Sequence, residues 1–213
     1  MNQFLIVDDH PLFRTALSAA VQRVVPSISI REATSLYEAN RALKSEPVDV
    51  LLLDLHMSDS DGFAGLINIR HDYPHIPVII VSAIEGAEVV QKSISFGAAA
   101  YIPKSFGVDQ ICEALEAVLN GDIWMPDGAD ALDEKGAQEL EKAEKLASLT
   151  PAQIKVLLGI RGGRLNKQIA YDHGITEATV KAHVTAIFRK LGVMNRTQAV
   201  LYADALEVER PAI

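Results

Sequence analysis

Short apolar runs in the first half of the chain end in polar side chains that carry oxygen or positive charge. These side chains are Asp8 and Asp9 after the first run, Asp54 after a second, Ser82 after a third and Lys104 after a fourth. Carboxylates that lie close together repel one another and need a cation, and a site made of several oxygen ligands is typical of Mg²⁺. If folding brings these groups together, the cluster has the chemistry of a phosphoryl acceptor.

Each group has a defined task in that chemistry. Asp54 attacks phosphorus and becomes an aspartyl phosphate, while Mg²⁺ held by the neighbouring carboxylates neutralises charge on the donor. Lys104 supplies a positive charge for one phosphoryl oxygen, and Ser82 supplies a hydroxyl for another. A metal-dependent phosphatase is an alternative function for the same groups. It would also need a general acid and a substrate cap, and the sequence offers no candidate for either.

The apolar runs themselves predict the strands that hold these groups. They are continuous rather than alternating, which is typical of strands covered on both faces of a parallel sheet. The runs are residues 4–7, 28–30 (the weakest), 50–53, 78–81 and 100–102.

Helical patterns fill the gaps between these strands. Apolar stripes cover residues 12–24 and 111–119, and Ser35 with Glu38 has the spacing of a capping box. We therefore predict a doubly wound α/β domain built from five βα units with right-handed crossovers. In the strand order 2-1-3-4-5 the first and third strands are neighbours, so Asp9 and Asp54 would meet across the crevice where ligands bind.

Charge is distributed unevenly along the 213 residues, although the chain carries a net charge of −8. Residues 1–125 hold 8 Lys/Arg and 16 Asp/Glu, residues 126–147 hold 3 and 7, and residues 148–213 hold 9 and 5. The C-terminal part is therefore basic, with a net charge of +4, behind an acidic first half. This asymmetry favours a polyanionic partner at the C-terminal end.

The basic part contains helix signals and no strand. Thr150, followed by Pro151 and Gln153, opens one helix, and a short helix over residues 166–173 ends before Gly174. A longer helix runs from Thr176 to Leu191 and stops at Gly192, and Asn195 caps a last helix through Ala205.

The long helix has two faces of different character. Val180, Val184, Ile187 and Leu191 form an apolar stripe, whereas Lys181, Thr185 and Arg189 lie on the neighbouring face. A short helix, a tight turn and a helix of this kind predict a helix-turn-helix whose second helix enters the major groove of double-stranded DNA. There Lys181 and Thr185 can reach base edges or phosphates, and the residues placed for phosphates are Asn166, Lys167, Lys190 and Arg196.

Residues 125–147 join the two halves. The segment begins with turn residues and continues as an acidic, alanine-rich stretch in which Glu139, Glu141 and Glu144 are expected to face water. We predict a partly helical linker without specificity of its own. The predicted domains are thus residues 1–124, the linker 125–147, and residues 148–213.

The motifs of the first half resemble a two-component response-regulator receiver domain over about residues 3–120. They are Leu5-Ile6-Val7-Asp8-Asp9-His10, Leu52-Leu53-Asp54-Leu55-His56-Met57, Val81-Ser82-Ala83 and Gly97 through Lys104. The resemblance implies a flavodoxin-like fold, phosphorylation of Asp54 by a cognate histidine kinase, and Mg²⁺ bound by Asp9, Asp54 and the His56 carbonyl, with Asp8 acting through water. It also implies that Ser82 and Tyr101 form a switch pair. His56 and Ile84 would tune the slow loss of the phosphoryl group.

Two positions depart from the receiver pattern. Ser58 and Ser105 stand where many receivers have proline. Neither change removes a charged group, so we expect phosphoacceptance to persist.

The second half is similar to the LuxR-type output domain, and with a receiver upstream the architecture is that of the NarL/FixJ class. The matching segments are residues 149–163, 166–170, 179–184 and 191–193. The resemblance implies an all-α, four-helix DNA-binding domain with Thr179, Lys181, Ala182 and Thr185 on the DNA side. Gln153 replaces a common glutamate and can still cap. Ala182 and Thr185 replace bulkier or basic residues of some members, so base preference does not transfer.

These observations predict a phosphorylation-gated transcription regulator rather than a dedicated enzyme. We hypothesise that the unphosphorylated receiver hides Lys181 and Thr185 on the recognition helix, and that phosphate at Asp54 releases it and promotes a homodimer. A phosphorylation-independent regulator with a vestigial acidic pocket remains an alternative.

Other features limit the class of protein. The single cysteine, Cys112, excludes an internal disulfide, and no apolar run is long enough for a membrane span, so we expect a cytoplasmic protein without a membrane partner. His10, His56, His71 and His75 lack the spacing of paired ligands and are predicted to lie at the surface. The segment Asp59-Ser60-Asp61-Gly62 lacks the closing ligands of a calcium loop and is predicted to be a turn.

Overall fold

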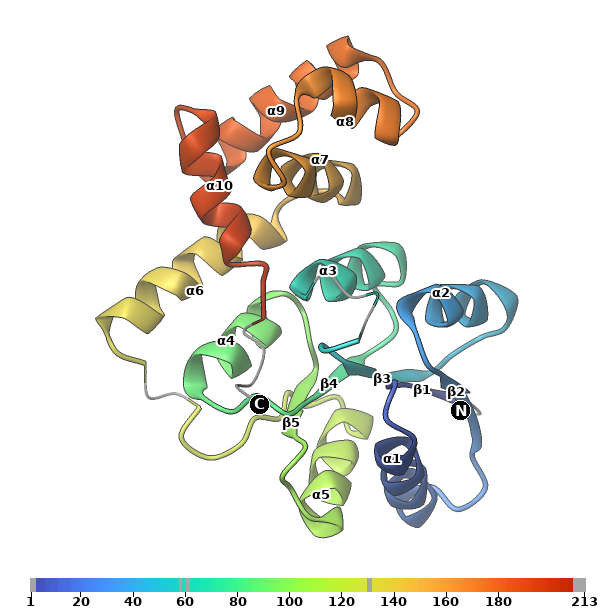
Figure 1. The fold of residues 1–213 in the computed structure, drawn as a ribbon. Coiled ribbons are helices and arrows are strands. Elements are labelled where there is room, and N and C mark those ends of the chain that lie inside the picture. Colours follow the sequence, from blue (N-terminus) through green and yellow to red (C-terminus); the bar gives the residue numbers. More distant parts are fainter. Residues whose placement is uncertain (1–2, 58, 60–61, 130–131, 209–213) are drawn as a thin grey trace.

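The computed structural model describes residues 3–57, 59, 62–129 and 132–208, and its first half is an α/β layer structure (Figure 1). Five parallel strands form one sheet in the order β2-β1-β3-β4-β5, as the sequence predicts. The strands are β1 (Gln3–Val7), β2 (Ser29–Ala33), β3 (Val50–Asp54), β4 (Val78–Ser82) and β5 (Ala100–Pro103). The helices between and after them are α1 (Pro11–Val24), α2 (Leu36–Ser45), α3 (Phe63–Asp72), α4 (Ala87–Ser95) and α5 (Val108–Leu119).

Helices cover both faces of the sheet, which is why its central strands are apolar throughout. In β1 the side chains of Leu5 and Val7 lie in one core, and those of Phe4 and Ile6 lie in another. Figure 1 shows α1 and α5 on one face and α2, α3 and α4 on the other. Strand β2, at the edge, is only partly buried, which explains the weak apolar signal of its sequence.

The second half consists of helices in the part that the structure describes. After α6 (Glu134–Ala147) come α7 (Pro151–Arg161), α8 (Asn166–Asp172), α9 (Glu177–Leu191) and α10 (Arg196–Asp204). The predicted four-helix, helix-turn-helix arrangement is therefore confirmed.

Side-chain caps set the predicted helix ends. Thr150 and Gln153 form the complete capping box, Thr176 accepts from the Thr179 N–H, and Asn195 accepts from the Gln198 N–H. Gly192 ends α9 in the left-handed conformation, at φ 71°, where a side chain would be strained.

The capping box predicted at α2 is only half formed. Ser35 accepts from the Glu38 N–H, but the Glu38 carboxylate turns to the backbone N–H and hydroxyl of Thr34 instead. The remaining N–H groups of the first turn, those of Leu36 and Tyr37, donate to the carboxylate of Asp59, 3.0 Å away in each case.

The expectation that the charged side of α6 faces water is wrong for Glu139. Its carboxylate lies 3.2 Å from the ammonium of Lys92 on α4 and is largely buried, whereas Glu141 is exposed. Ala143 and Leu146 on the same helix are fully buried. The helix therefore packs against α4 of the first domain and contributes Ala143 and Leu146 to the apolar core.

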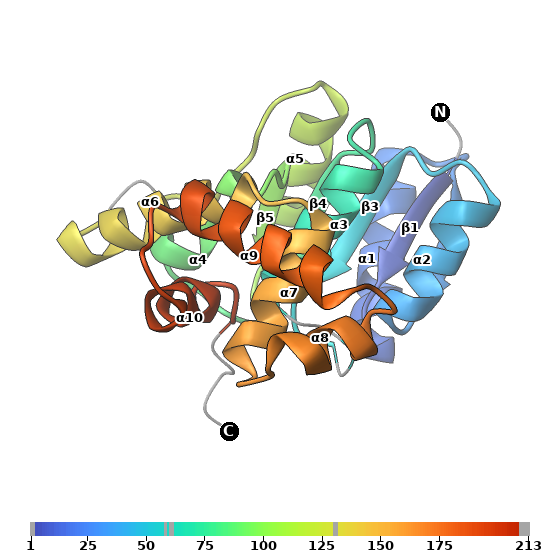
Figure 2. The ribbon, with the colours of Figure 1, turned by 90° about the horizontal axis from the view of Figure 1, so that it is seen from above.

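The two halves of the molecule share one continuous core. It extends from the α3–α4 side of the sheet into α6, α7, α9 and α10, which Figures 1 and 2 both show lying over that side. The Phe63 N–H at the start of α3 donates to the Leu206 carbonyl after α10, at 3.0 Å. Gly62 permits this approach, since a Cβ atom there would collide with the same carbonyl.

None of the helices that the structure describes combines the length and the apolar character needed to cross a bilayer.

Candidate functional site

The predicted acidic groups come together at the carboxyl edge of the sheet. Asp8 follows β1 and Asp54 ends β3, and both side chains are almost completely buried. Strands β1 and β3 are neighbours, so one oxygen from each of Asp8, Asp9 and Asp54 lies within 4.8 Å of the others. The predicted meeting of Asp9 and Asp54 at this edge is therefore present, and we call the cluster of three carboxylates the acidic pocket.

Lys104 supplies the positive charge that this group of carboxylates requires. Its ammonium lies 2.7 Å from Asp8 Oδ2 and 2.8 Å from Asp54 Oδ2, although only the second contact has hydrogen-bond geometry. The ammonium also lies over the Phe13 ring, 4.8 Å from its centroid. Asp54 Oδ1 accepts a hydrogen bond from the His56 N–H at 2.9 Å, so both oxygens of this carboxylate are oriented.

The pocket contains oxygens that suit a hard cation. Asp9 Oδ1 and Asp8 Oδ2 are buried and accept no hydrogen bond of good geometry, although His10 Nδ1 lies 2.8 Å from the first and the Lys104 ammonium lies 2.7 Å from the second. Carboxylates are the ligands that Mg²⁺ prefers, and they lie close enough to share one ion. The donor set of Asp8, Asp9 and Asp54 therefore fits a divalent metal.

His10 belongs to this pocket, in addition to being exposed as predicted. Its Nδ1 lies 2.8 Å from Asp9 Oδ1, 3.1 Å from Asp8 Oδ1 and 4.0 Å from Asp54 Oδ2. No ligand-like spacing in the sequence marks His10, because it contacts carboxylates from two strands that are distant in the chain. Its position directly after the aspartate pair was the available signal.

The predicted switch residues Ser82 and Tyr101 meet at one backbone unit, that of Ile84. The Tyr101 hydroxyl donates to the Ile84 carbonyl at 2.7 Å, and the Ile84 N–H donates to Ser82 Oγ at 3.2 Å. Burial raises the pKa of the Tyr101 phenol well above its ordinary value, so the hydroxyl remains a donor at neutral pH. Ser82 Oγ also lies 3.5 Å from His56 Nδ1, which places His56 beside the switch.

Two further residues that the sequence did not reveal make hydrogen bonds near the pocket or at a helix start beside it. Arg14 on α1 donates to the Asp8 carbonyl at 2.8 Å and pairs with Glu32 of β2 at the same distance. Asp59, predicted to lie in a turn, caps α2. Ser58, Ser60 and Asp61 lie outside the described residues, and the peptide bond between Lys104 and Ser105 is trans.

A second candidate site is the exposed face of α9. Lys181, Ala182, Thr185 and Arg189 are all exposed, while Val180, Ile187 and Leu191 are fully buried, as the two predicted faces require. Lys181 pairs with Glu177 one turn earlier, at 3.1 Å. Thr179 is half-buried, and its hydroxyl lies 2.8 Å from that of Thr176 in the helix cap.

The basic residues assigned to phosphates have different surroundings. Lys167 is exposed, but the Lys190 ammonium donates to the Ser148 carbonyl at 2.6 Å and to Gln153 Oε1 at 3.0 Å. Lys190 is therefore engaged inside the domain, joining α9 to the end of α6 and the start of α7. Arg196 donates to Asn166 Oδ1 at 3.3 Å, so these two predicted residues adjoin.

The hypothesis that the first domain hides the recognition helix does not describe this structure. Lys181 and Thr185 are exposed, and Figure 1 shows α9 on the far side of α7 from the sheet. The interdomain contact uses α6, α7 and the end of α10 instead: α6 packs on α4, α7 packs on α3, and the Leu206 carbonyl after α10 accepts from the start of α3.

Two protein families match separate parts of the chain. A sequence profile described as "Response regulator receiver domain" matches residues 4–116, and one described as "Bacterial regulatory proteins, luxR family" matches residues 147–203. The glycerol metabolism activator of Pseudomonas putida is 39% identical, with 97% of each chain covered. The transcriptional regulatory protein LnrK of Bacillus subtilis is 32% identical, covering 95% of this chain and 96% of its own.

Solved structures show the same fold. RcsB of Salmonella enterica serovar Typhimurium, bound to the promoter P1flhDC in the presence of the phosphomimetic BeF3-, superposes with a TM-score of 0.56 at 18% identity. The match covers 97% of this chain and 99% of RcsB. A structure of two RcsB dimers bound to two parallel DNAs also has a TM-score of 0.56, at 21% identity, covering 97% of this chain and 100% of RcsB.

Proposed function

The chain belongs to the response regulators that join a receiver domain to a LuxR-type DNA-binding domain, and from that membership we propose a phosphorylation-gated regulator of transcription. Asp54 is the phosphoacceptor. The observation that carries this proposal is the buried Asp54 carboxylate, which is oriented by Lys104 and the His56 N–H and lies beside two further carboxylates. The domains are residues 1–124 and 148–213, joined by residues 125–147.

The proposed reaction transfers a phosphoryl group from a phosphohistidine of a cognate kinase. The Asp54 oxygen forms a bond to phosphorus as the P–N bond breaks, and the electron pair of that bond stays on the histidine nitrogen. Lys104 and Ser82 contact phosphoryl oxygens, so Lys104 exchanges one carboxylate contact for a phosphoryl contact. Asp9, Asp54 and the His56 carbonyl would hold Mg²⁺, with Asp8 acting through water, and the bound ion supplies positive charge toward the phosphoryl group.

The switch follows from the position of Ser82. Its hydroxyl accepts from the Ile84 N–H, and the same hydroxyl donates to a phosphoryl oxygen at Asp54, which draws the Ser82 side chain away from Ile84. A movement of Ser82 disturbs Ile84, and through Ile84 the hydrogen bond of Tyr101. The phosphoryl state therefore biases the loop between β4 and α4.

The proposed output is binding of double-stranded DNA by a homodimer. Lys181, Ala182, Thr185 and Arg189 form the exposed face that enters the major groove, with Thr179 at its start. Lys167, Asn166 and Arg196 approach phosphates, whereas the internal contacts of Lys190 favour a structural role. Two copies double the contacts, as in the RcsB dimers bound to DNA.

Labelling by a small phosphodonor in Mg²⁺ tests the phosphoacceptor. We expect stable label on the wild-type chain, none on Asp54→Asn and full label on Asp59→Asn, because Asp59 contacts the start of α2 rather than the pocket. Absence of label on the wild-type chain supports a vestigial pocket. Rapid turnover of varied phosphate esters supports the phosphatase alternative.

Selection of DNA sites by the full chain, with and without BeF3-, tests the gating. We expect selected duplexes with two half-sites and tighter binding in the presence of the phosphomimetic. Equal affinities in the two conditions contradict gating while leaving DNA binding intact.

A further inference from the structure

Helix α6 is joined to the receiver through a buried ion pair. The Lys92 side chain on α4 is 9% exposed, and its ammonium lies 2.8 Å from Glu88 on its own helix and 3.2 Å from Glu139 on α6. Glu139 also pairs with Lys142, at 2.5 Å. One step earlier on α4, the Gln91 amide donates to the Ala129 carbonyl at 3.0 Å. We call this set, Gln91, Lys92, Ala129 and Glu139, the α4–α6 junction.

The receiver end of this junction lies directly after the switch loop. Helix α4 begins at Ala87, three residues after Ile84, whose backbone is held by Ser82 on one side and Tyr101 on the other. A change in either hydrogen bond therefore acts on the first turn of α4. Lys92 lies just over one turn further along the same helix.

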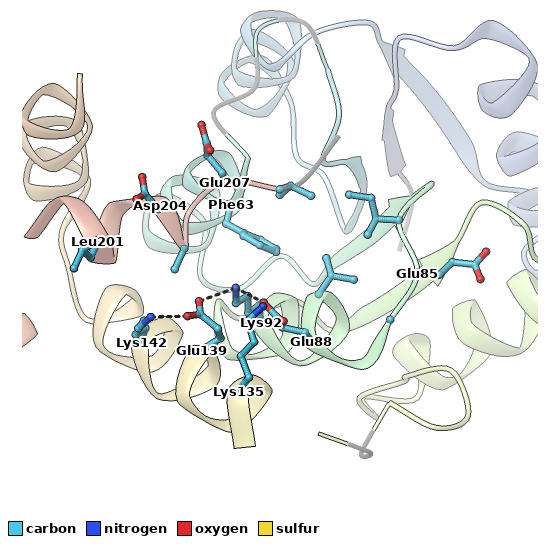
Figure 3. Close-up of a pocket in the computed structure, with 15 residues that line it drawn as sticks. Phe63, Glu85, Glu88, Lys92, Lys135, Glu139, Lys142, Leu201, Asp204 and Glu207 are labelled. Atoms are coloured by element: carbon cyan, nitrogen blue, oxygen red, sulfur yellow. Dashed lines mark hydrogen bonds and ion pairs between the residues drawn. The ribbon is translucent and has the colours of Figure 1, made fainter. Parts of the chain in front are cut away.

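The space around the start of α4 leaves room for movement. A cavity of about 670 Å³ separates the switch loop and α4 from α10 and the segment that follows it. Figure 3 shows the chain of ion pairs from Glu88 through Lys92 and Glu139 to Lys142 along one wall of this cavity. Close-packed interiors resist displacement, and a cavity along one side of α4 lessens that resistance.

The other end of α6 is joined to the recognition helix. Ser148 caps the C-terminus of α6, and its carbonyl accepts the hydrogen bond from Lys190 on α9 at 2.6 Å. Lys145 in the last turn of α6 lies 3.3 Å from the Tyr202 hydroxyl on α10. Gly136 near the start of α6 and Ala143 and Leu146 nearer its end are buried, so α6 is held at both ends of its length.

We propose that α6 transmits the phosphoryl signal from α4 to the recognition helix α9, with Glu139 as its contact on the receiver and Ser148 as its contact on the output domain. This proposal rests on the proposed function, since it assigns the path of the same signal. The earlier hypothesis explained the control of DNA binding by a receiver that covers the recognition helix. Transmission through α6 replaces it, because the recognition face is exposed while α6 contacts both domains.

Glu139 is the informative residue on physical grounds. Neutralising Glu139 removes the partner that a nearly buried ammonium has on another helix, and among the described residues Lys92 then keeps only Glu88, on its own helix. The substitution Glu139→Gln keeps the size of the side chain and leaves α6 intact, but weakens the one charged contact between α6 and α4 that the described residues show. Glu141→Gln is the matched control, because Glu141 is exposed and the ion pair that the described residues give it, with Lys145, lies within α6.

The test compares the affinity of the full chain for a duplex that the wild-type protein has selected from random DNA, with and without BeF3-. Allosteric coupling is typically 5- to 150-fold, so we expect a wild-type ratio of about 5-fold or more, and a ratio near 1 for Glu139→Gln. Lys92→Met, which replaces the buried ammonium by an apolar group of similar length, should also bring the ratio toward 1. Glu141→Gln should retain the wild-type ratio.

Hydrogen exchange of residues 134–147 provides a second readout. We expect BeF3- to change exchange there in the wild-type chain but not in Glu139→Gln, while both chains keep full label at Asp54. A wild-type ratio in both Glu139→Gln and Lys92→Met overturns the proposal. A ratio of 1 in the wild-type chain instead contradicts the gating on which the proposal rests, so the two failures are distinguishable.

Discussion

The pocket at the sheet edge and the exposed face of α9 both depend on charged side chains, but they are built in opposite ways. In the pocket, Asp8, Asp54 and Lys104 come from the carboxyl ends of three strands and are nearly excluded from water. On α9, Lys181 and Arg189 come from one helix and are exposed. Charges in the pocket therefore depend strongly on one another, whereas those on α9 act almost independently.

This difference separates the effects of substitution. A buried charge that loses its partner destabilises the fold, because neither solvent nor salt replaces the partner. An exposed charge contributes little to folding, since water screens it, but it remains available to a polyanion. Substitutions in the pocket should therefore change stability, and substitutions on the exposed face of α9 should change DNA affinity alone.

The largest effect is expected for Lys104→Met. It leaves Asp8 and Asp54 facing each other without the ammonium, so we expect the free energy of unfolding to fall by about 3–5 kcal/mol. Urea denaturation measures this change, and millimolar Mg²⁺ should restore part of it. Lys44→Met, at an exposed position of α2, is the control; equal losses in the two variants would contradict a special role for the buried charge.

Lys181→Met should have the converse effect. We expect DNA affinity to fall by about 1–3 kcal/mol, while the free energy of unfolding changes by less than about 0.5 kcal/mol, because the pair with Glu177 is exposed. Fluorescence titration and urea denaturation measure the two quantities. Lys155→Met removes the same charge from the exposed side of α7, and an equal loss of affinity there would indicate a nonspecific charge effect.

Arg189 and Lys190 are adjacent on α9, and they allow an exposed charge to be compared with an internally bonded charge in one helical turn. Lys190 makes two internal hydrogen bonds, so Lys190→Met should lower the free energy of unfolding by about 1.5 kcal/mol. Arg189→Met should leave stability unchanged and reduce the slope of log affinity against log salt by about 1 if it contacts phosphate. If Lys190→Met instead reduced the salt slope and Arg189→Met lowered the stability, Lys190 would be a DNA contact.

The smallest effect is expected at Asp59. Its carboxylate accepts from two N–H groups of α2, so Asp59→Ala should lower the free energy of unfolding by about 1 kcal/mol, as for other helix caps. Phosphodonor labelling of Asp54 should remain complete in this variant. Loss of label would mean that Asp59 also positions the phosphoacceptor.

Much of the fold follows from local patterns. Continuous apolar runs identified β1, β3, β4 and β5, and caps such as Thr150, Thr176 and Asn195 set the helix starts within the DNA-binding half. The convergence of Asp9 and Asp54 was also predictable, because polar residues at the ends of adjacent parallel strands must meet at one edge. Each of these inferences needs only the chain's periodicity and one topological rule.

Other features were decided by contacts between distant segments. The sequence of α6 indicates a solvated linker, since its charges outnumber its apolar residues, yet Glu139 has a buried partner on α4. Lys190 and Arg189 are neighbouring basic residues of the same helix. What distinguishes them is that Ser148 and Gln153 lie where the Lys190 ammonium can donate to them. His10 joins the pocket for a similar reason.

The sequence by itself determined the strands, the helices, the acidic edge and the basic recognition face, because periodicity, capping and charge act over a few residues. Only the tertiary structure decided which charges are buried and which surfaces the two domains share. Burial depends on what packs opposite a residue, and for Lys92, Glu139 and Lys190 that partner lies tens of residues away in the chain.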